Sequence, residues 1–127
     1  MLKVTENIWQ VGGDGLTAAG DAAAYLIRFG HQAALIDAGC GSGHWQPVDN
    51  ISLCLPPDAD SVILLLSHCH YDHTGGAARV REQYGCKIIA HEKDALFLEK
   101  GRLIGIGVQL SFGNFLSRPP GGKISGI

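Results

Sequence analysis

The order of hydrophobic and polar positions predicts short strands in the first part of the chain. Residues 8–11 form a mainly apolar run that ends at a glycine pair. In residues 23–29 the side chains alternate between two faces, with Tyr25, Ile27 and Phe29 on one and Arg28 on the other. Alternation over this length is typical of a strand with one buried face. Gly30-His31 fits a two-residue hairpin turn, because glycine tolerates the positive φ of the first turn position. Residues 32–36 are therefore expected to form the return strand.

Strands and helices alternate in the next segment. Residues 62–66 are apolar throughout, which is the pattern of a strand buried on both faces. A helix is expected from an N-cap at Thr74 until Gly85, a residue suited to ending it. A strand at residues 87–90 and a short helix at residues 92–100 follow. This order predicts an α/β (α+β) fold.

Composition places the chain among small globular domains. It has 127 residues, 46% of them hydrophobic and 17% charged, with a mean hydropathy of +0.11. A disordered chain would be more polar and more highly charged. The net charge of -2 leaves no basic excess, so no nucleic-acid partner is expected.

Cysteine usage and hydropathy bear on the compartment. The four cysteines form no C-x-x-C pair, and we expect buried free thiols rather than a disulfide framework. The longest uncharged run, residues 103–117, is shorter than the ~20 residues that span a bilayer. The sequence therefore predicts a cytoplasmic protein without a membrane segment.

Four potential metal ligands follow the apolar strand at residues 62–66. They are His68, His70, Asp72 and His73. Imidazole and carboxylate groups suit zinc, with iron and manganese as alternatives. In an extended segment His68 and His70 point the same way, so both can bind one ion. The following turn brings Asp72 and His73 toward a second ion. The alternative is a solvated polar loop.

The run at residues 67–76 resembles the His-x-His-x-Asp-His signature of the metallo-beta-lactamase superfamily. Residues 8–12, 35–39 and 88–92 also resemble that superfamily, and the glyoxalase II-like branch, the hydroxyacylglutathione hydrolases, is the most similar. The resemblance covers about residues 4–101. It implies the N-terminal half of an αββα sandwich with a dinuclear metal site at one edge of the sheets.

The resemblance also implies a reaction and roles. His68 and His70 would bind the first metal, and Asp72 and His73 the second. A water activated between the ions would attack the ester, thioester or amide carbonyl of a small-molecule substrate. Asp72 would also orient that water, which makes it the candidate catalytic residue. Persulfide dioxygenases and RNA-processing nucleases share the motif, so the reaction stays open.

Three further residues near the motif have competing interpretations. Asp37 resembles the family's aspartate that supports the metal loop from behind, and its alternative is a turn residue that ends a strand. Cys69 points away from its histidine neighbours if the segment is extended, so it is interpreted as a packing residue. His91 is interpreted as the start of a helix rather than as a ligand.

The end of the chain departs from the family pattern. The family completes its site with a later His, a bridging Asp and a final His, but residues 101–127 contain no His, Asp or Glu. We divide the chain into residues 1–101, half of the family domain, and a glycine-rich tail at 102–127 from a truncated or frame-shifted product. The alternatives are a fragment completed by another chain and a remodelled binding protein. An uncovered sheet face and an apolar strand or unsettled segment at residues 102–117 predict self-association.

Overall fold

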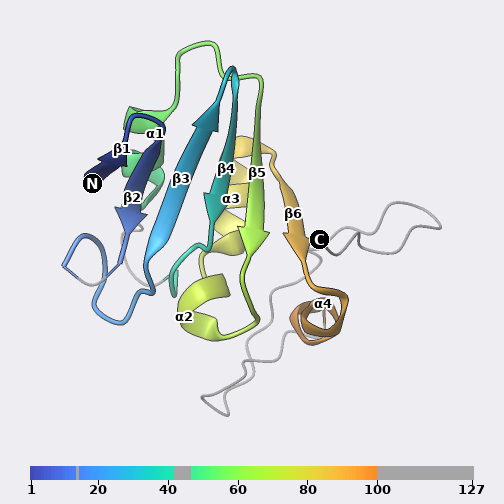
Figure 1. Cartoon of the computed structure of the whole chain (residues 1–127). Coiled ribbons are helices and arrows are strands. Elements are labelled where there is room, and N and C mark those ends of the chain that lie inside the picture. The colour runs from blue at the N-terminus through green and yellow to red at the C-terminus, as the bar shows by residue number, and fades with distance from the viewer. Residues whose placement is uncertain (14, 42–46, 100–127) are drawn as a thin grey trace.

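The computed structural model describes residues 1–13, 15–41 and 47–99, and Figure 1 shows their strands side by side in a single sheet. The strands and helices are, in chain order, β1 (Leu2–Thr5), β2 (Ile8–Gly12), β3 (Ala24–Phe29), β4 (Gln32–Ile36), α1 (Pro47–Cys54), β5 (Ser61–Leu66), α2 (Tyr71–Thr74), α3 (Ala77–Tyr84), β6 (Lys87–Ala90) and α4 (Glu92–Glu99).

The sheet is mixed, and its spatial order follows the chain from β1 to β6. Strands β1 to β4 pair antiparallel, and Phe29 pairs with Gln32 across the expected two-residue turn, where Gly30 has a φ of 61°. Strands β4, β5 and β6 pair parallel, so each connection must cross over the sheet. The α/β class is confirmed, and so are the strands expected at residues 8–11, 23–29 and 32–36, which the structure has at 8–12, 24–29 and 32–36.

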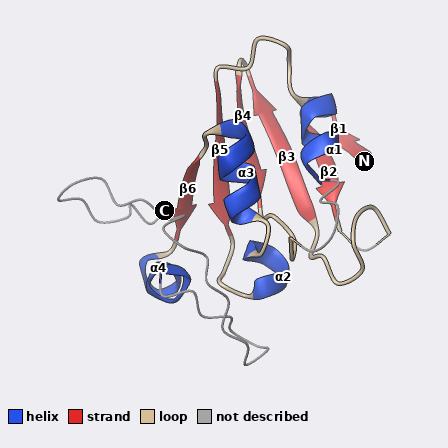
Figure 2. Cartoon of the chain, turned by 180° about the vertical axis from the view of Figure 1, so that it is seen from behind, coloured by secondary structure: helices blue, strands red, loops and turns tan. Residues whose placement is uncertain are grey.

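The hydrophobic core lies between the sheet and the helices behind it, α1 and α3 (Figure 2). Helix α1 packs on β2, and α3 packs on β5 and β6. The inward side chains Leu26, Leu35 and Leu64 are each 0% exposed, as are Ile51 from α1 and Val80 from α3. Burial of these apolar side chains is the main stabilising contribution to the fold.

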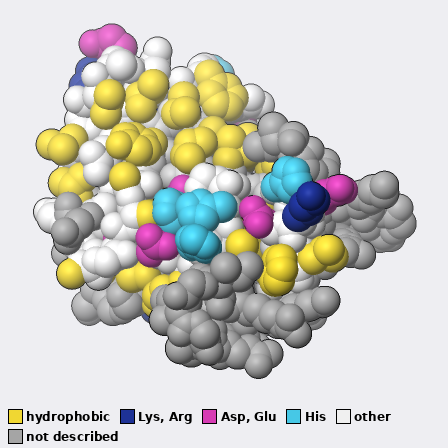
Figure 3. All heavy atoms as spheres, turned by 60° about the horizontal axis from the view of Figure 1, so that its bottom comes forward, with side chains coloured by type: hydrophobic (Ala, Val, Ile, Leu, Met, Phe, Trp, Pro, Cys, Tyr) yellow, Lys and Arg dark blue, Asp and Glu magenta, His cyan; other side chains and the backbone are white. Residues whose placement is uncertain are grey.

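The opposite face of the sheet is also apolar, and no helix of the described ranges lies over it (Figure 1). Cross-strand partners run from Tyr25 to Ile36, from Ile36 to Leu65 and from Leu65 to Ile89. These side chains are only partly buried. In Figure 3 hydrophobic side chains gather on the surface above a patch of histidines. We call Tyr25, Ile36, Leu65 and Ile89 the open face.

The expected helix start at Thr74 is wrong. Thr74 is the last residue of α2, is 0% exposed, and its hydroxyl donates to the carbonyl of His70 at 3.1 Å. Gly76, not Thr74, precedes α3. The helix breaks there because other loops take its hydrogen bonds: the carbonyls of Asp72 and His73 accept from Ala22 and Ala38, and the Gly76 N–H donates to Gly39. Position 75 requires glycine, since a Cβ would lie 2.1 Å from the carbonyl oxygen of Cys40. The expected end at Gly85 is confirmed, with a φ of 60°.

The sequence pattern missed β1 and α1. Strand β1 is an edge strand of four residues, all of them exposed, and its Leu-Lys-Val-Thr alternation is too short to stand out as a strand. Helix α1 is fixed by tertiary contacts, since Asn50 Nδ2 donates to the carbonyl of Val11 at 2.8 Å and Ile51 enters the core.

Three other expectations concern the cysteines, a membrane-spanning helix and the C-terminal elements. All four cysteines are free and buried, as expected. No helix in the described part of the chain is long and apolar enough to cross a membrane. The strand expected at residues 102–117 and the end of the helix expected at residues 92–100 lie outside the described residues.

The two faces of β5 should respond differently to truncation. Leu64→Ala removes a fully buried side chain and is expected to lower the free energy of unfolding by about 2–5 kcal/mol. Ile63→Ala, next to it on the open face, should cost less than half as much, because part of its side chain already contacts water. Urea denaturation measures both. Equal losses would contradict an open face in solution.

Candidate metal centre

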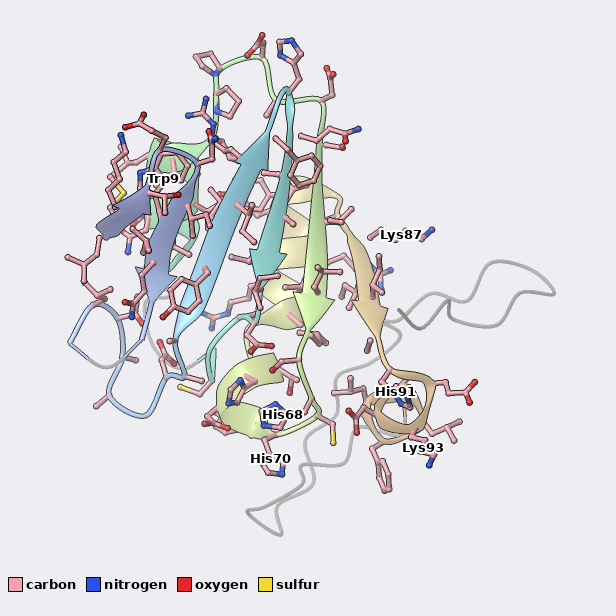
Figure 4. The ribbon with its side chains drawn as sticks, viewed as in Figure 1. Trp9, His68, His70, Lys87, His91 and Lys93 are labelled. Carbon is pink, nitrogen blue, oxygen red and sulfur yellow. The ribbon has the colours of Figure 1, made fainter. Side chains whose placement is uncertain are left out.

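The candidate ligands lie at the edge of the sheet where β4 and β5 end. Because β4 and β5 are parallel, the residues that follow them emerge at the same edge. Asp37 directly follows β4, and the segment from Ser67 to His70 follows β5 and leads into α2. Figure 4 shows His68 and His70 at this edge beside α2.

The three histidines of the motif come together, as the sequence predicts. The ring centroids of His68 and His70 lie 4.5 Å apart, and those of His68 and His73 lie 4.0 Å apart. The Asp72 carboxylate lies 3.5 Å from Nε2 of His73, and its side chain is 47% exposed. Figure 3 shows the histidines as one surface patch with acidic side chains on either side. Within this cluster His70 is exposed, and His68 and His73 are partly buried.

Asp37 is a buried carboxylate that contacts the metal loop from behind. It is 4% exposed and has a φ of 63°, a left-handed conformation that aspartate tolerates better than most residues. Its carboxylate accepts hydrogen bonds from the Ser67 backbone N–H at 2.8 Å and from the Ser67 hydroxyl at 2.6 Å. Nδ1 of His73 lies 2.7 Å from the same carboxylate. Since a carboxylate only accepts, Nδ1 of His73 carries a proton, and Nε2 is the ring nitrogen left for a metal.

Ser67 extends this arrangement to His68, which the sequence pattern did not suggest. Its hydroxyl has a single proton, which it donates to Asp37, so toward His68 the same oxygen acts as an acceptor. Nδ1 of His68 lies 2.9 Å from that oxygen and therefore carries a proton too. In both His68 and His73, Nε2 is therefore the ring nitrogen available as a metal ligand. The only signal in the sequence is the position of Ser67 directly before the first histidine.

The donor set fits a divalent transition metal ion. No group of three or more His, Cys, Asp or Glu side chains within residues 1–13, 15–41 and 47–99 is arranged to hold an ion as it stands. The chemistry nevertheless matches, because three clustered imidazoles and one carboxylate are the ligands that zinc, iron and manganese bind. A hydrogen bond from the second ring nitrogen to a carboxylate is also the usual support of a metal-binding histidine.

Two neighbouring residues have the positions expected of them. Cys69 is 5% exposed and belongs to the core, which agrees with a packing role. Burial and a hydrogen bond to Asp94 raise the pKa of the Cys69 thiol to about 11, so it is protonated at neutral pH. His91 starts α4, because its carbonyl accepts from the Ala95 N–H at 2.8 Å and its Nδ1 lies 3.2 Å from the Lys93 backbone N–H (Figure 4).

Backbone hydrogen bonds hold α2 against the loops that precede it. The Ala38 N–H donates to the carbonyl of His73 at 2.7 Å, and the Ala22 N–H donates to the carbonyl of Asp72 at 3.1 Å. The contact between Ala22 and Asp72 joins the β2–β3 loop to the site, and the adjacent buried residue Asp21 was also missed by sequence analysis. In the sequence Asp21 is one polar residue in a loop of small ones.

The fold and the site together define the class of α/β proteins that carry a histidine-rich loop at the edge of a mixed sheet. The sequence matches the profile described as "Metallo-beta-lactamase superfamily" over residues 17–125, and the chain belongs to that superfamily.

Individual relatives agree with this assignment. The hydroxyacylglutathione hydrolase of Bradyrhizobium sp. (strain ORS 278) is 34% identical over 56 residues, which are 43% of this chain and 22% of that protein. The corresponding enzyme of Anaeromyxobacter dehalogenans is 34% identical over 71 residues, or 56% of this chain and 26% of that protein. The chain thus spans about a quarter of the length of these curated relatives.

Solved structures share the fold. The subclass B3 metallo-beta-lactamase BJP-1 of Bradyrhizobium japonicum has a TM-score of 0.69 and 27% identity, covering 99% of this chain and 44% of that one. The metallo-beta-lactamase MIM-1 of Novosphingobium pentaromativorans has a TM-score of 0.66 and 27% identity, covering 83% and 36%. These neighbours confirm the metallo-beta-lactamase fold, of which this chain contains the N-terminal part.

Replacing Asp37 tests whether it orients His73. Asn tolerates the positive φ, so Asp37→Asn keeps the backbone but loses the negative charge that three donors share. We expect the free energy of unfolding to fall by about 2 kcal/mol, since buried hydrogen bonds to charged groups are lost. We also expect the His73 ring to lose its fixed Nδ1–H tautomer, as measured by imidazole ¹⁵N shifts. Asp60→Asn, at the far end of β5, is the control. A variant with the stability and His73 shifts of this control would contradict the assignment.

Proposed function

We propose that the chain carries the metal-binding loop of a metallo-hydrolase that cleaves a thioester or ester-type small-molecule substrate. The observation that carries this proposal is the cluster of His68, His70 and His73 beside Asp72, with Asp37 buried behind it. Membership of the metallo-beta-lactamase superfamily supports it.

Zinc is the metal proposed, with iron and manganese as alternatives. His68 and His70 would hold one ion, and Asp72 and His73 a second. When bound, such ions polarise a carbonyl oxygen and lower the pKa of a water molecule to near neutral. Asp37 and Ser67 engage Nδ1 of His73 and of His68, which leaves Nε2 of each ring as the nitrogen to bind a metal.

The chain's own residues would then position the reacting groups. Asp72 accepts a hydrogen bond from the attacking water at its carboxylate and orients that water toward the substrate carbonyl. Its 47% exposure leaves the carboxylate accessible to both. Asp37 keeps the proton on Nδ1 of His73 throughout, since its carboxylate is buried and already accepts from Ser67. Asp72 is therefore the catalytic residue proposed, and Asp37 a positioning residue.

The substrate class is inferred from the relatives. The curated proteins that match are named hydroxyacylglutathione hydrolases, enzymes whose substrate is a thioester. The structural neighbours are metallo-beta-lactamases, whose substrate is a cyclic amide. We favour the thioester, because the run at residues 67–76 resembles the glyoxalase II-like branch and the curated relatives that match in sequence, 34% identical over 56 and 71 residues, are hydroxyacylglutathione hydrolases.

The alternative is a metal-binding fragment that turns over substrate only when another chain completes the site. The loop offers two protein ligands to each ion, whereas a catalytic zinc usually has three. No His, Asp, Glu or Cys occurs in residues 101–127 to add one. A division into a family-like part at residues 1–101 and a tail at residues 102–127 would account for this.

Zinc binding distinguishes the proposed ligands from their neighbour. We expect the purified chain to bind zinc more weakly than a complete dinuclear site and below full occupancy. His70→Ala should remove most of the bound zinc, because it takes a donor from the exposed cluster. Cys69→Ser should retain it, because Cys69 faces the core. Elemental analysis after dialysis measures both. Loss of zinc in Cys69→Ser but not in His70→Ala would refute the ligand assignment.

A hydrolysis assay separates the enzyme from the binding fragment. The zinc-loaded chain is incubated with a hydroxyacylglutathione thioester, with a simple ester and with a β-lactam. Thioester turnover that is lost in Asp72→Asn would support the hydrolase. Zinc binding without turnover of any substrate would favour the fragment. Faster β-lactam than thioester turnover would contradict the substrate class.

The open face leads to a separate proposal, self-association. Tyr25, Ile36, Leu65 and Ile89 form a continuous apolar surface without a helix over it in the described ranges. Large exposed apolar patches favour association. We expect light scattering to detect dimers or larger species, and Leu65→Glu to reduce them. A monomer near 13.5 kDa with a cooperative melt would contradict this proposal.

A further inference from the structure

Asp21 is a buried carboxylate outside the metal-binding motif, with no role in the proposed reaction. It is 5% exposed and lies in the loop between β2 and β3. Burying a charged group is costly unless hydrogen bonds compensate. The hydrogen-bond donors around Asp21 therefore indicate its structural role.

The two carboxylate oxygens of Asp21 connect two separate loops. Oδ2 accepts from the Thr17 hydroxyl at 2.6 Å and from the Ala18 N–H at 3.1 Å, both within its own loop. Oδ1 accepts from the Cys40 N–H at 2.8 Å and from the Cys40 thiol at 2.6 Å, in the loop after β4. Burial alone would raise the pKa of Asp21, but the hydrogen bonds from Cys40, Thr17 and Ala18 outweigh it and lower that pKa. The group is ionised at neutral pH.

The loop after β4 is in turn packed against α2. Gly39 approaches Asp21 so closely that an added Cβ would lie 2.9 Å from the carboxylate carbon. The Gly39 carbonyl accepts from the Gly76 N–H at 3.1 Å, just beyond α2. The Cys40 thiol also interacts with Tyr71, the first residue of α2.

The residue after Asp21 contacts a proposed ligand directly. The Ala22 N–H donates to the carbonyl of Asp72 at 3.1 Å. Because a peptide N–H moves with its neighbouring residue, the anchoring of Asp21 also sets the position of this donor. Asp21 therefore reaches the metal loop by two routes, through Ala22 to Asp72 and through Cys40 to Tyr71.

We propose that Asp21 is a positioning residue for the metal loop. It anchors the β2–β3 loop to Cys40 so that the Ala22 N–H holds the backbone of Asp72, and with it the Asp72 carboxylate, in place for metal binding. This inference rests on the proposed function for its effect on metal, but its effect on Ala22 can be measured without metal.

The main test compares Asp21→Asn with two controls in the full chain. Val80→Ala removes part of a fully buried side chain in α3, so it lowers stability away from the loop. Asp58→Asn removes an exposed carboxylate that contacts His31 at 2.8 Å at the opposite end of the sheet. We expect the zinc Kd to rise about tenfold in Asp21→Asn only, the lower end of the range for residues that support ligands. If Asp21 had a purely structural role, Asp21→Asn would lower the melting temperature but leave the zinc Kd equal to that of Val80→Ala.

Amide hydrogen exchange of the zinc-free chain supplies the second readout. We expect the Ala22 amide to exchange faster in Asp21→Asn than in Val80→Ala at matched global stability. If wild type binds no zinc, the proposed function fails while this readout still decides the role of Asp21. Unchanged Ala22 exchange overturns the inference, and so does an unchanged zinc Kd in a chain that binds zinc.

The Cys40 variants test the connection if Asp21→Asn does not fold. Cys40→Ser keeps a side-chain donor for Asp21, and Cys40→Ala removes it. We expect Cys40→Ala to weaken zinc binding and speed Ala22 exchange, and Cys40→Ser to restore both toward wild type. Equal behaviour of these two variants would overturn the proposed route through Cys40.

Discussion

The buried negative charge of Asp37 is the interaction on which the candidate site depends. A carboxylate that is 4% exposed must be compensated, and the compensating donors are the Ser67 N–H, the Ser67 hydroxyl and Nδ1 of His73. These groups belong to the segment directly after β5 and to α2, whereas Asp37 directly follows β4. The same hydrogen bonds therefore join three segments and fix which ring nitrogen His73 presents. Through Ser67 they also fix the ring nitrogen that His68 presents. Ligand orientation and local stability have a common cause here.

Close backbone approach is the second requirement of the site. The loop after β4 packs on the turn after α2 with no space for side chains, since a Cβ on Gly41 would lie 2.6 Å from the carbonyl oxygen of Gly75. Such contact permits the short hydrogen bonds from Ala38 to His73 and from Gly76 to Gly39. The glycines around the motif thus have a specific purpose. They let the loops that carry Asp21 and Asp37 reach the backbone of the proposed ligands.

The sheet has two apolar faces with different environments. The inner face packs on α1 and α3, and its leucines are fully buried. The open face carries a continuous row of apolar side chains that no helix of the described ranges covers. This asymmetry accords with a chain that covers 44% of BJP-1, whose fold is a sandwich. The site lies at one end of the sheet, and hydrophobic surface side chains adjoin the histidine patch in Figure 3.

The sequence by itself determined the elements whose information is local. Apolar runs predicted strands at residues 8–11, 23–29, 32–36 and 62–66, each within one residue of the observed bounds. The spacing of His68, His70 and His73 predicted that these residues lie close together. Only the tertiary structure decided the features that depend on contacts distant in sequence. Thr74 resembles an N-cap, but α2 ends there instead, because the carbonyls of Asp72 and His73 bond to Ala22 and Ala38 in other loops. Asp21 and Ser67 are ordinary polar residues in the sequence, and their importance comes from partners that folding brings within hydrogen-bond distance. The preference for a strand or a helix is encoded in a few neighbouring residues. The hydrogen bonds that compensate a buried carboxylate come instead from loops that the parallel pairing of β4 and β5 brings together.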